Sequence, residues 1–516
     1  MIKRRSKKLP PGFLIVQIDG LGREALIRAI RQRKAPFIRN LLRGRHQGGY
    51  YMQKLCPGLP STTPTVQAEL LYGVKQAFPG FRYIRRRDGK SIYFGTLGQV
   101  SDLEDELFAE TPGILRNNGS SYFNIFHGGA DHTRFSSSGL GKGELWLSTR
   151  RKWRALGHLA FVLLTTIPFL IWLFLVEICY EFYDSAKAFL RHKIYSGQVS
   201  FLIRALIRTV GDELGLAVLY QDLSHGRQHV MVNLITYDKA VHLRGPEHPH
   251  ALRSIRHTDR LVKHLWRAAK RSKRVDYDFF IFSDHGMTPA KPVAKDAGRD
   301  LQSLLRDEFS ARARAMGILQ PNLWLKATGS FGHVYLSREG APWMHDTLVN
   351  ALPGMDAYFT ALKYVSAWVT RLPNDRLRYN ATPDPSDGSA LSQPLALDES
   401  APETWGDLDA VFVRNLFGAA RHPDAGDVLL FGARDGERVW NFLFEYGCHG
   451  AWEVEEQDAF LIQSSHLGPA AKNGEAVTPL AMHDFFERHY FQSATSAGAT
   501  QVAPALAAEK PEKPKG

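Results

Sequence analysis

The chain has 516 residues, of which 44% are hydrophobic and 23% charged, and its net charge is +13. These values exclude a fully disordered chain and allow more than one structural unit. The positive charge suits anionic partners, namely phosphorylated substrates, nucleic acid or acidic lipid head groups, although any single basic cluster is more simply a solvated face. We find no nucleic-acid-binding module. The three cysteines are odd in number and far apart, which argues against a disulfide framework or a cysteine zinc site.

The first predicted elements are a strand and a helix. Residues 13–18 form an apolar run that ends at Asp19, as is typical of a buried strand. Further on, Thr63, Pro64 and Gly73 have the order of an N-cap, a first helical residue and a C-terminal stop. The Thr63 hydroxyl would then lie at a helix N-terminus, where backbone N–H groups can receive a phosphate. On this segment alone, an ordinary capped helix is the preferred interpretation.

Residues 155–176 carry no formally charged side chain if His158 is neutral. About 20 such residues can cross a bilayer once. A single crossing, however, would put the candidate site residues before and after this segment on opposite sides of the membrane. Basic residues flank both ends, which suits two cytoplasmic ends. We therefore expect a re-entrant or in-plane hairpin with Pro168 near its bend, and a membrane-associated catalytic domain on the cytoplasmic face. The alternative is a helix buried in the core or in a dimer interface.

Two later β-rich runs repeat the design of the first strand: residues 230–237 precede Asp238, and residues 278–283 precede Asp284. A helical pattern around residues 255–269 separates them. Strands that alternate with helices predict an α/β fold, with a mostly parallel central sheet and helices on both faces. The predicted organisation is a catalytic domain in two parts, residues 1–149 and 196–492, a hydrophobic helical insert at 150–195, and a disordered tail at 493–516.

Candidate metal ligands follow these strands. Asp238 and His242 are four residues apart and can offer an oxygen and a nitrogen to one cation. Asp284 and His285 are adjacent, and a later histidine, His449, lies between glycines. Ligands bind beyond the carboxyl ends of parallel strands, so we expect these side chains to converge there with Asp19. Three aspartates and three histidines suffice for two metal sites that share one nucleophile.

These motifs, in this order, resemble the alkaline phosphatase superfamily, and most of all its nucleotide pyrophosphatase/phosphodiesterase branch. In that branch an aspartate follows the first strand, as Asp19 does, and a threonine precedes a glycine by ten residues, as Thr63 does. An aspartate and a histidine four apart precede Gly-Pro, as Asp238 and His242 do. Residues 283–287 match the string Ser-Asp-His-Gly-Met, and His449 supplies the late His-Gly. The resemblance spans residues 13–465, apart from the hydrophobic insert.

The resemblance implies two divalent metal ions, usually zinc, in two ligand sets. Asp238, His242 and His449 would hold one ion. Asp19, Asp284 and His285 would hold the other, together with the Thr63 oxygen. Thr63 would attack the phosphorus in line, and water would then hydrolyse the phosphothreonine intermediate.

The substrate-binding residues depart from the family pattern. Nucleotide-cleaving members carry an asparagine soon after the nucleophile helix, and residues 78–86 contain none. Arg82, Arg85 or Asn124 are the candidates to replace it. Thr62 is a rival nucleophile with the wrong spacing to Gly73, and His333 is a rival ligand that we interpret as structural.

The sequence thus predicts a metal-dependent phosphodiesterase or phosphomonoesterase near a membrane, which acts on a phosphorylated substrate, with a lipid-linked phosphate as one candidate. One alternative is a phosphotransferase that passes the Thr63-bound group to an alcohol. Another is an inactive membrane-surface scaffold, which is disfavoured because every expected ligand is present. A sulfatase is rejected, because Cys56 lacks the proline spacing and the arginine of the sulfatase motif.

Overall fold

The computed structural model describes residues 9–44, 49–134, 136–141, 222–317, 322–382, 393–471 and 475–491, with a few isolated positions between 171 and 220. Most of the expected membrane segment, residues 155–176, and the expected disordered tail from residue 493 lie outside this set. Among the described residues, no helix combines the length and the apolar character that crossing a bilayer requires.

A seven-stranded sheet forms the centre of the protein, in the order β2-β19-β8-β1-β7-β5-β6. β1 pairs in parallel with β7 and β8, whereas β19 pairs antiparallel with β8 and β2. The predicted α/β fold with a mostly parallel sheet is therefore confirmed. The strands are β1 (Pro11–Ile18), β2 (Tyr50–Leu55), β5 (Gly119–Tyr122), β6 (His132–Arg134), β7 (His229–Leu234), β8 (Asp276–Phe282) and β19 (Ala459–Ser464).

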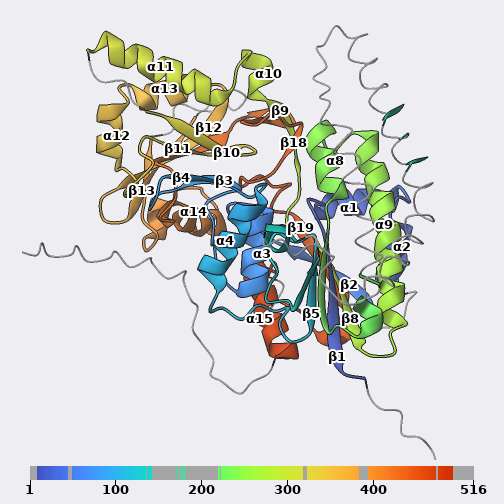
Figure 1. Ribbon diagram of the computed structural model, residues 1–516. Helices are drawn as coiled ribbons and strands as arrows, with labels where there is room; N and C mark the ends of the chain where they lie inside the picture. Colours follow the sequence, from blue (N-terminus) through green and yellow to red (C-terminus); the bar gives the residue numbers. More distant parts are fainter. Residues whose placement is uncertain are drawn as a thin grey trace, which may run out of the picture.

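The central sheet is buried on both faces, because apolar side chains of its strands point to both sides of the sheet. In β1, Leu14, Val16 and Ile18 point into one hydrophobic core, while Phe13 and Ile15 point into the other. Figure 1 shows helices on each side of this sheet. One face packs against α1 (Arg23–Arg31), α2 (Pro36–Leu42), α8 (Thr236–Arg244) and α9 (Pro249–Lys270). The other packs against α3 (Thr63–Tyr72), α4 (Leu97–Phe108) and α15 (Pro479–Tyr490).

A second sheet of six antiparallel strands lies beside the first, in the order β10-β11-β15-β12-β13-β14. It has its own apolar cores on its two faces. Sequence analysis did not predict this sheet. Its strands are β10 (Trp324–Thr328), β11 (Phe331–Tyr335), β12 (Val365–Leu372), β13 (Arg376–Ala381), β14 (Leu395–Leu397) and β15 (Val428–Gly432). Its helices are α10 (Val293–Ala297), α11 (Leu301–Ala315), α12 (His345–Ala351), α13 (Met355–Ala361) and α14 (Ala410–Arg421).

Short elements complete the described part of the chain. A four-stranded sheet, β16-β17-β9-β18, lies between the two large sheets, and β3 pairs with β4. These elements are β3 (Arg82–Arg85), β4 (Lys90–Tyr93), β9 (Thr288–Pro292), β16 (Arg434–Asp435), β17 (Arg438–Asn441), β18 (Gly447–Cys448), α5 (Ser137–Gly141), η1 (Pro402–Thr404) and η2 (Ser465–Leu467).

Two predicted boundaries were wrong. The run at residues 230–237 does not continue as a strand to Asp238, because β7 ends at Leu234 and α8 begins at Thr236. Asp238 therefore lies in the first turn of a helix, where an acidic side chain suits the helix dipole. At the nucleophile helix, Thr62 rather than Thr63 is the N-cap, and Thr63 is the first helical residue. Gly73 ends this helix with φ of 70°, as predicted.

His333 joins the second sheet to the segment after α3. Its Nε2 donates to the Pro79 carbonyl at 2.8 Å, and its Nδ1 accepts from the Gly426 N–H at 3.0 Å. Both ring nitrogens are therefore used by the main chain, in agreement with the predicted structural role. Burial lowers the pKa of His333 to about 3, so the ring stays neutral in the folded protein.

We expect His333 to destabilise the fold in acid. The unfolded chain takes up a proton on this ring below about pH 6.5, whereas the folded protein does so only near pH 3. Stability contributed by the neutral ring is therefore present above pH 6.5 and is lost as the pH falls towards 3. His333→Gln should flatten the pH dependence of the unfolding free energy over this range by up to about 1.4 kcal/mol per pH unit. Urea unfolding at pH 7 and pH 5.5 measures this difference, and parallel pH dependences would contradict it.

Candidate metal centre and nucleophile

Three of the candidate ligands, Asp19, Asp284 and His285, form a compact group that we call the Asp19 set. Asp19 directly follows β1, and Asp284 and His285 follow the neighbouring strand β8. Their ligand atoms all lie within 4.8 Å of one another. The His285 Nε2 is 3.4 Å from Asp284 Oδ2 and 3.8 Å from Asp19 Oδ1. Adjacent parallel strands thus bring these residues together at one edge of the sheet.

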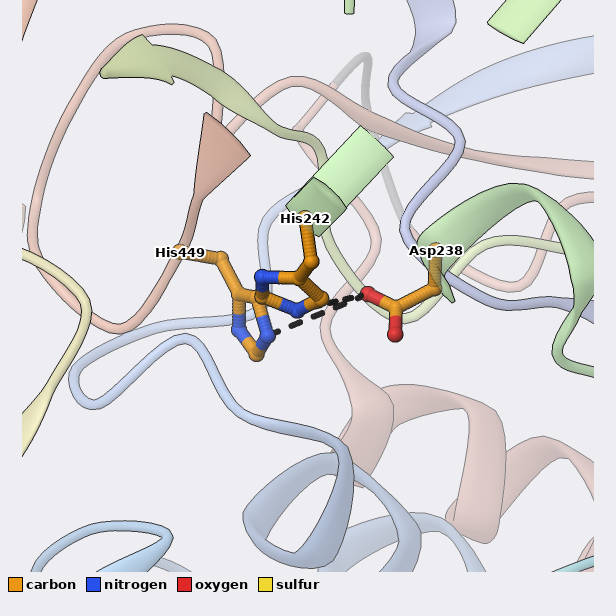
Figure 2. Close-up of side chains that lie close together, drawn as sticks. All are labelled: Asp238, His242 and His449. Carbon is orange, nitrogen blue, oxygen red and sulfur yellow. Dashed lines mark ion pairs between the residues drawn. The ribbon is translucent and has the colours of Figure 1, made fainter. Parts of the chain in front are cut away.

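The other three candidates, Asp238, His242 and His449, form the Asp238 set (Figure 2). Asp238 and His242 lie one turn apart on α8, so both side chains are on the same face of that helix. The His242 Nε2 is 3.2 Å from Asp238 Oδ1, and the His449 Nε2, from the loop after β18, is 4.0 Å from the same oxygen. Figure 2 shows both imidazoles converging on this carboxylate.

Main-chain carbonyls orient all three histidines. The Nδ1 of His242 lies 3.0 Å from the Gly447 carbonyl, that of His285 lies 3.0 Å from the Gly286 carbonyl, and that of His449 lies 2.8 Å from the Ser61 carbonyl. A carbonyl oxygen only accepts, so each Nδ1 carries a proton and each Nε2 is directed at the carboxylates. In the neutral form of each ring, that Nε2 offers a lone pair to a cation.

Each of the three carboxylates has one oxygen held and one oxygen free. Asn233 donates to Asp19 Oδ2 at 2.8 Å, the Gly20 N–H donates to Asp284 Oδ1 at 3.1 Å, and the Lys239 ammonium lies 3.3 Å from Asp238 Oδ2. The other oxygens, Asp19 Oδ1, Asp284 Oδ2 and Asp238 Oδ1, are buried and accept no hydrogen bond. A buried oxygen without a partner is costly. These three oxygens are the ones that face the histidine Nε2 atoms.

The electrostatics of the Asp19 set reflect this lack of partners. Burial raises the pKa of Asp284 to about 7, against the opposing hydrogen bond from Gly20. Burial and the nearby carboxylates of Asp284 and Asp238 raise the pKa of Asp19. Burial also lowers the pKa of His285 to about 4, so this histidine brings no positive charge. The Asp19 set thus gathers acidic groups without a counter-charge of its own.

In the Asp238 set, positive side chains offset the negative charge of the carboxylate. Burial opposes ionisation of Asp238, but His242 and Lys239 outweigh it and hold the pKa of Asp238 well below its usual range. Burial likewise opposes charge on His242, but the Asp238 and Glu445 carboxylates raise its pKa. Burial lowers the pKa of His449. A divalent cation would supply the positive charge that both sets accommodate, and mixed carboxylate and imidazole donors suit such an ion.

The nucleophile candidate lies beside the Asp19 set. Thr63 begins α3, and its hydroxyl oxygen is 3.4 Å from His285 Nε2. The rings of His285 and His449 stack with centroids 3.7 Å apart, which brings the two sets into contact. The rival hydroxyl, that of Thr62, is fully buried and lies 2.9 Å from the Thr65 hydroxyl. Of the two threonines, Thr63 is the one with a contact to a candidate ligand.

The predicted substrate-binding residues have other partners. Arg85 pairs with Asp88 and Glu106. The Arg82 guanidinium lies over the Tyr93 ring at 4.5 Å. Asn124 is fully buried and bonds to Gln67, Ser121 and the Met231 carbonyl. None of these contacts is with either ligand set, so a role in substrate binding stays a prediction for all three residues.

Three further residues touch the ligands, and sequence analysis missed them. Asn233 orients Asp19, Glu445 lies 3.0 Å from His242 Nδ1, and Lys239 pairs with Asp238. The side chain of Lys239 is 57% exposed, so it carries a positive charge at the border between the ligands and solvent. Its position next to Asp238 in the sequence was the one feature that could have predicted its contact with the site. Asn233 and Glu445 stand in no motif that would single them out.

Part of the chain matches a known protein family. The sequence profile of the Type I phosphodiesterase / nucleotide pyrophosphatase family matches residues 193–373, which contain Asp238, His242, Asp284 and His285. No curated protein matches the chain in sequence.

Two solved structures share the fold. One is an inactive variant of murine ectonucleotide pyrophosphatase/phosphodiesterase 5 in complex with AMP, with a TM-score of 0.50 and 12% identity over 95% of this chain and 97% of that chain. The other is phosphonoacetate hydrolase from Sinorhizobium meliloti 1021 with phosphonoformate, with a TM-score of 0.50 and 14% identity over 94% and 97%. Residues 193–373 thus match the type I phosphodiesterase / nucleotide pyrophosphatase family, and the chain as a whole shares the fold of these two structures.

Proposed function

We propose that this protein hydrolyses phosphate esters through a phosphothreonine intermediate on Thr63, with one divalent cation in each ligand set. One observation carries the proposal. Three buried carboxylate oxygens without hydrogen bonds face three histidine Nε2 atoms, next to the Thr63 hydroxyl. The Asp19 set contains no positively charged side chain, and the donor geometry of both sets suits cations.

Zinc is the metal that the donor types favour. Each set offers imidazole nitrogen and carboxylate oxygen, the mixed ligation that Zn²⁺ accepts in catalytic sites. Asp19, Asp284 and His285 would hold one ion, and Asp238, His242 and His449 the other. Bound there, the ions supply Lewis acidity towards the Thr63 hydroxyl and the phosphoryl oxygens.

Thr63 carries the covalent chemistry. In the first step its Oγ1 forms a bond to phosphorus, the bond from phosphorus to the leaving oxygen breaks, and the leaving group departs as an alcohol or phosphate. In the second step the oxygen of water bonds to phosphorus and the bond to Thr63 Oγ1 breaks, which restores the hydroxyl. The start of α3 assists both steps, since N–H groups of a first helical turn lack partners within the helix and favour anions.

The substrate class is a phosphate diester or monoester that carries negative charge. Lys239 supports this choice, because its half-exposed ammonium stands beside the Asp238 set. The two structures that share the fold also bind anionic phosphorus compounds, AMP in one case and phosphonoformate in the other.

Thr63→Ala should lower kcat by roughly a thousandfold or more, because it removes the hydroxyl that forms the covalent intermediate. Hydrolysis of an aryl phosphate and of an aryl phosphodiester would measure the loss and would also show which ester class is preferred. The metal content should stay unchanged, since six other side chains hold the ions.

Thr62→Ala is the matched control, because it removes the adjacent hydroxyl, which contacts Thr65 instead of a ligand. Its kcat should stay within a few-fold of the wild-type value. Thr63→Ala protein with undiminished hydrolysis would remove Thr63 from the mechanism. Transfer to added glycerol in place of water would identify the protein as a phosphotransferase.

Removal of metal should abolish hydrolysis and lower the melting temperature. A chelator would leave the three buried carboxylate oxygens without a positive partner, and an ion at 100 times its Kd stabilises a fold by about 2.7 kcal/mol. Elemental analysis of the purified protein should find two divalent ions per chain, and Zn²⁺ should restore both activity and melting temperature. A fully active, metal-free protein would contradict the proposal.

We further propose that the protein works at the cytoplasmic face of a membrane, on a lipid-linked phosphate. The support is the uncharged run at residues 155–176 and the basic residues on both of its sides. Limited proteolysis of intact, sealed membranes should cleave before and after this run from the same side. Cleavage sites on opposite sides would rule out the hairpin, and a protein recovered without membranes would rule out the attachment.

A further inference from the structure

A buried carboxylate, that of Glu456, lies where three site loops meet. Its Oε2 is 2.9 Å from the Ser61 hydroxyl and accepts from the N–H groups of Gly450 at 3.1 Å and Ala451 at 2.8 Å. Its Oε1 accepts from the Thr288 hydroxyl at 3.3 Å. The side chain is wholly inaccessible to solvent, so it cannot touch a substrate. Its partners are all polar groups of the surrounding loops.

Each of these partners is close in sequence to a proposed site residue. Ser61 precedes the nucleophile Thr63 by two residues, Gly450 directly follows His449, and Thr288 follows His285 by three. The main chain of Glu456 adds a further link, because its carbonyl accepts from the Gly286 N–H at 3.0 Å. One side chain therefore connects the nucleophile loop with a loop from each ligand set.

The two residues that follow Glu456 reinforce this junction. Gln457 donates to the Gly58 carbonyl at 2.9 Å and to the Ala451 carbonyl at 3.2 Å. Asp458 accepts from Arg23 at 2.8 Å and from the Glu24 N–H at 3.2 Å, and so holds the start of α1 just after Asp19. The segment 456–458 thus contacts segments next to Thr63, His285 and His449, and the start of the helix that follows Asp19.

A carboxylate suits this place better than any other side chain. When ionised, it offers acceptors on both of its oxygens and no donor, and here two backbone N–H groups and two hydroxyls lie within hydrogen-bond distance of it. An amide of the same size would turn an NH₂ group towards N–H or hydroxyl donors on one side and leave buried donors unpaired. The loops would then move apart to admit water or find other partners.

We propose that Glu456 is a positioning residue, which sets the distance between Thr63 and the two ligand sets by holding their loops together. The inference rests on the proposed function, because it assigns Glu456 to the same centre. Residues that orient metal ligands from behind typically change metal affinity by about 10- to 100-fold when they are replaced.

The test is Glu456→Gln, with Glu455→Gln as the matched control. Glu455 is the preceding residue in the chain, but its side chain is partly exposed and pairs with Arg434. Three quantities would be measured: the zinc Kd by competition with a fluorescent chelator, the exchange of backbone amides, and kcat and KM for an aryl phosphate ester.

For Glu456→Gln we expect a zinc Kd at least tenfold higher and amides of Gly450 and Ala451 that exchange at least tenfold faster. The kcat should fall about tenfold or more while KM stays within threefold, because the substrate touches none of the altered groups. Glu455→Gln should stay within twofold of wild type in every measurement.

A folded Glu456→Gln protein with wild-type zinc affinity and wild-type amide exchange would overturn the inference, as would equal losses in Glu455→Gln. If Glu456→Gln is insoluble, Ser61→Ala replaces it: loss of this one donor should still raise the zinc Kd several-fold, and an unchanged Kd would count against the inference. Failure of the proposed function looks different, because then the wild-type protein itself would bind no zinc. Amide exchange would still decide whether Glu456 holds the loops.

Discussion

The site depends on enclosing three carboxylates from which water is largely excluded, each with one oxygen that the protein leaves without a hydrogen bond. Acidic groups so close together repel one another and resist ionisation, and the raised pKa values of Asp19 and Asp284 show the result. His285 does not relieve this repulsion in the Asp19 set, because burial lowers its pKa to about 4 and keeps its ring neutral. The members of the Asp19 set therefore supply no positive charge of their own to offset this repulsion.

Different parts of the fold supply different parts of this arrangement. Parallel strands β1 and β8 deliver the Asp19 set at one edge, while α8 delivers two members of the Asp238 set at helical spacing. The second sheet confines the His449 loop. Gly450 has φ of 122°, and a Cβ there would lie 2.5 Å from the Thr328 carbonyl of β10, so only glycine fits this close approach. The antiparallel sheet therefore shapes the centre without contributing a ligand to it.

Much of this could be predicted from the sequence. Apolar runs bounded by turn residues predicted β1 and β8. The aspartates and histidines in the motifs that follow predicted all six members of the two sets that the structure brings together. The pattern failed where local and tertiary preferences compete. Thr236 and Tyr237 favour strands by composition, yet they begin a helix, because packing rather than propensity decides where α8 starts.

The antiparallel sheet and the residues behind the ligands were beyond the reach of sequence patterns. β15 pairs with β11 and β12, which lie far from it in the sequence. The local pattern of apolar and polar residues does not indicate which strands pair with one another. Asn233 and Glu456 act through contacts with residues more than 160 positions away. Nothing in their immediate neighbours distinguishes them from ordinary polar residues.

The place of β19 in the central sheet has a consequence for biosynthesis. This strand comes from residues 459–464, yet it lies between β2 and β8, and the segment that links the site loops directly precedes it. The central sheet cannot be completed until residues 459–464 have been synthesised, since long-range pairings of this kind form late. The strand order thus places the closing of this sheet, and of the loops that depend on it, late in translation.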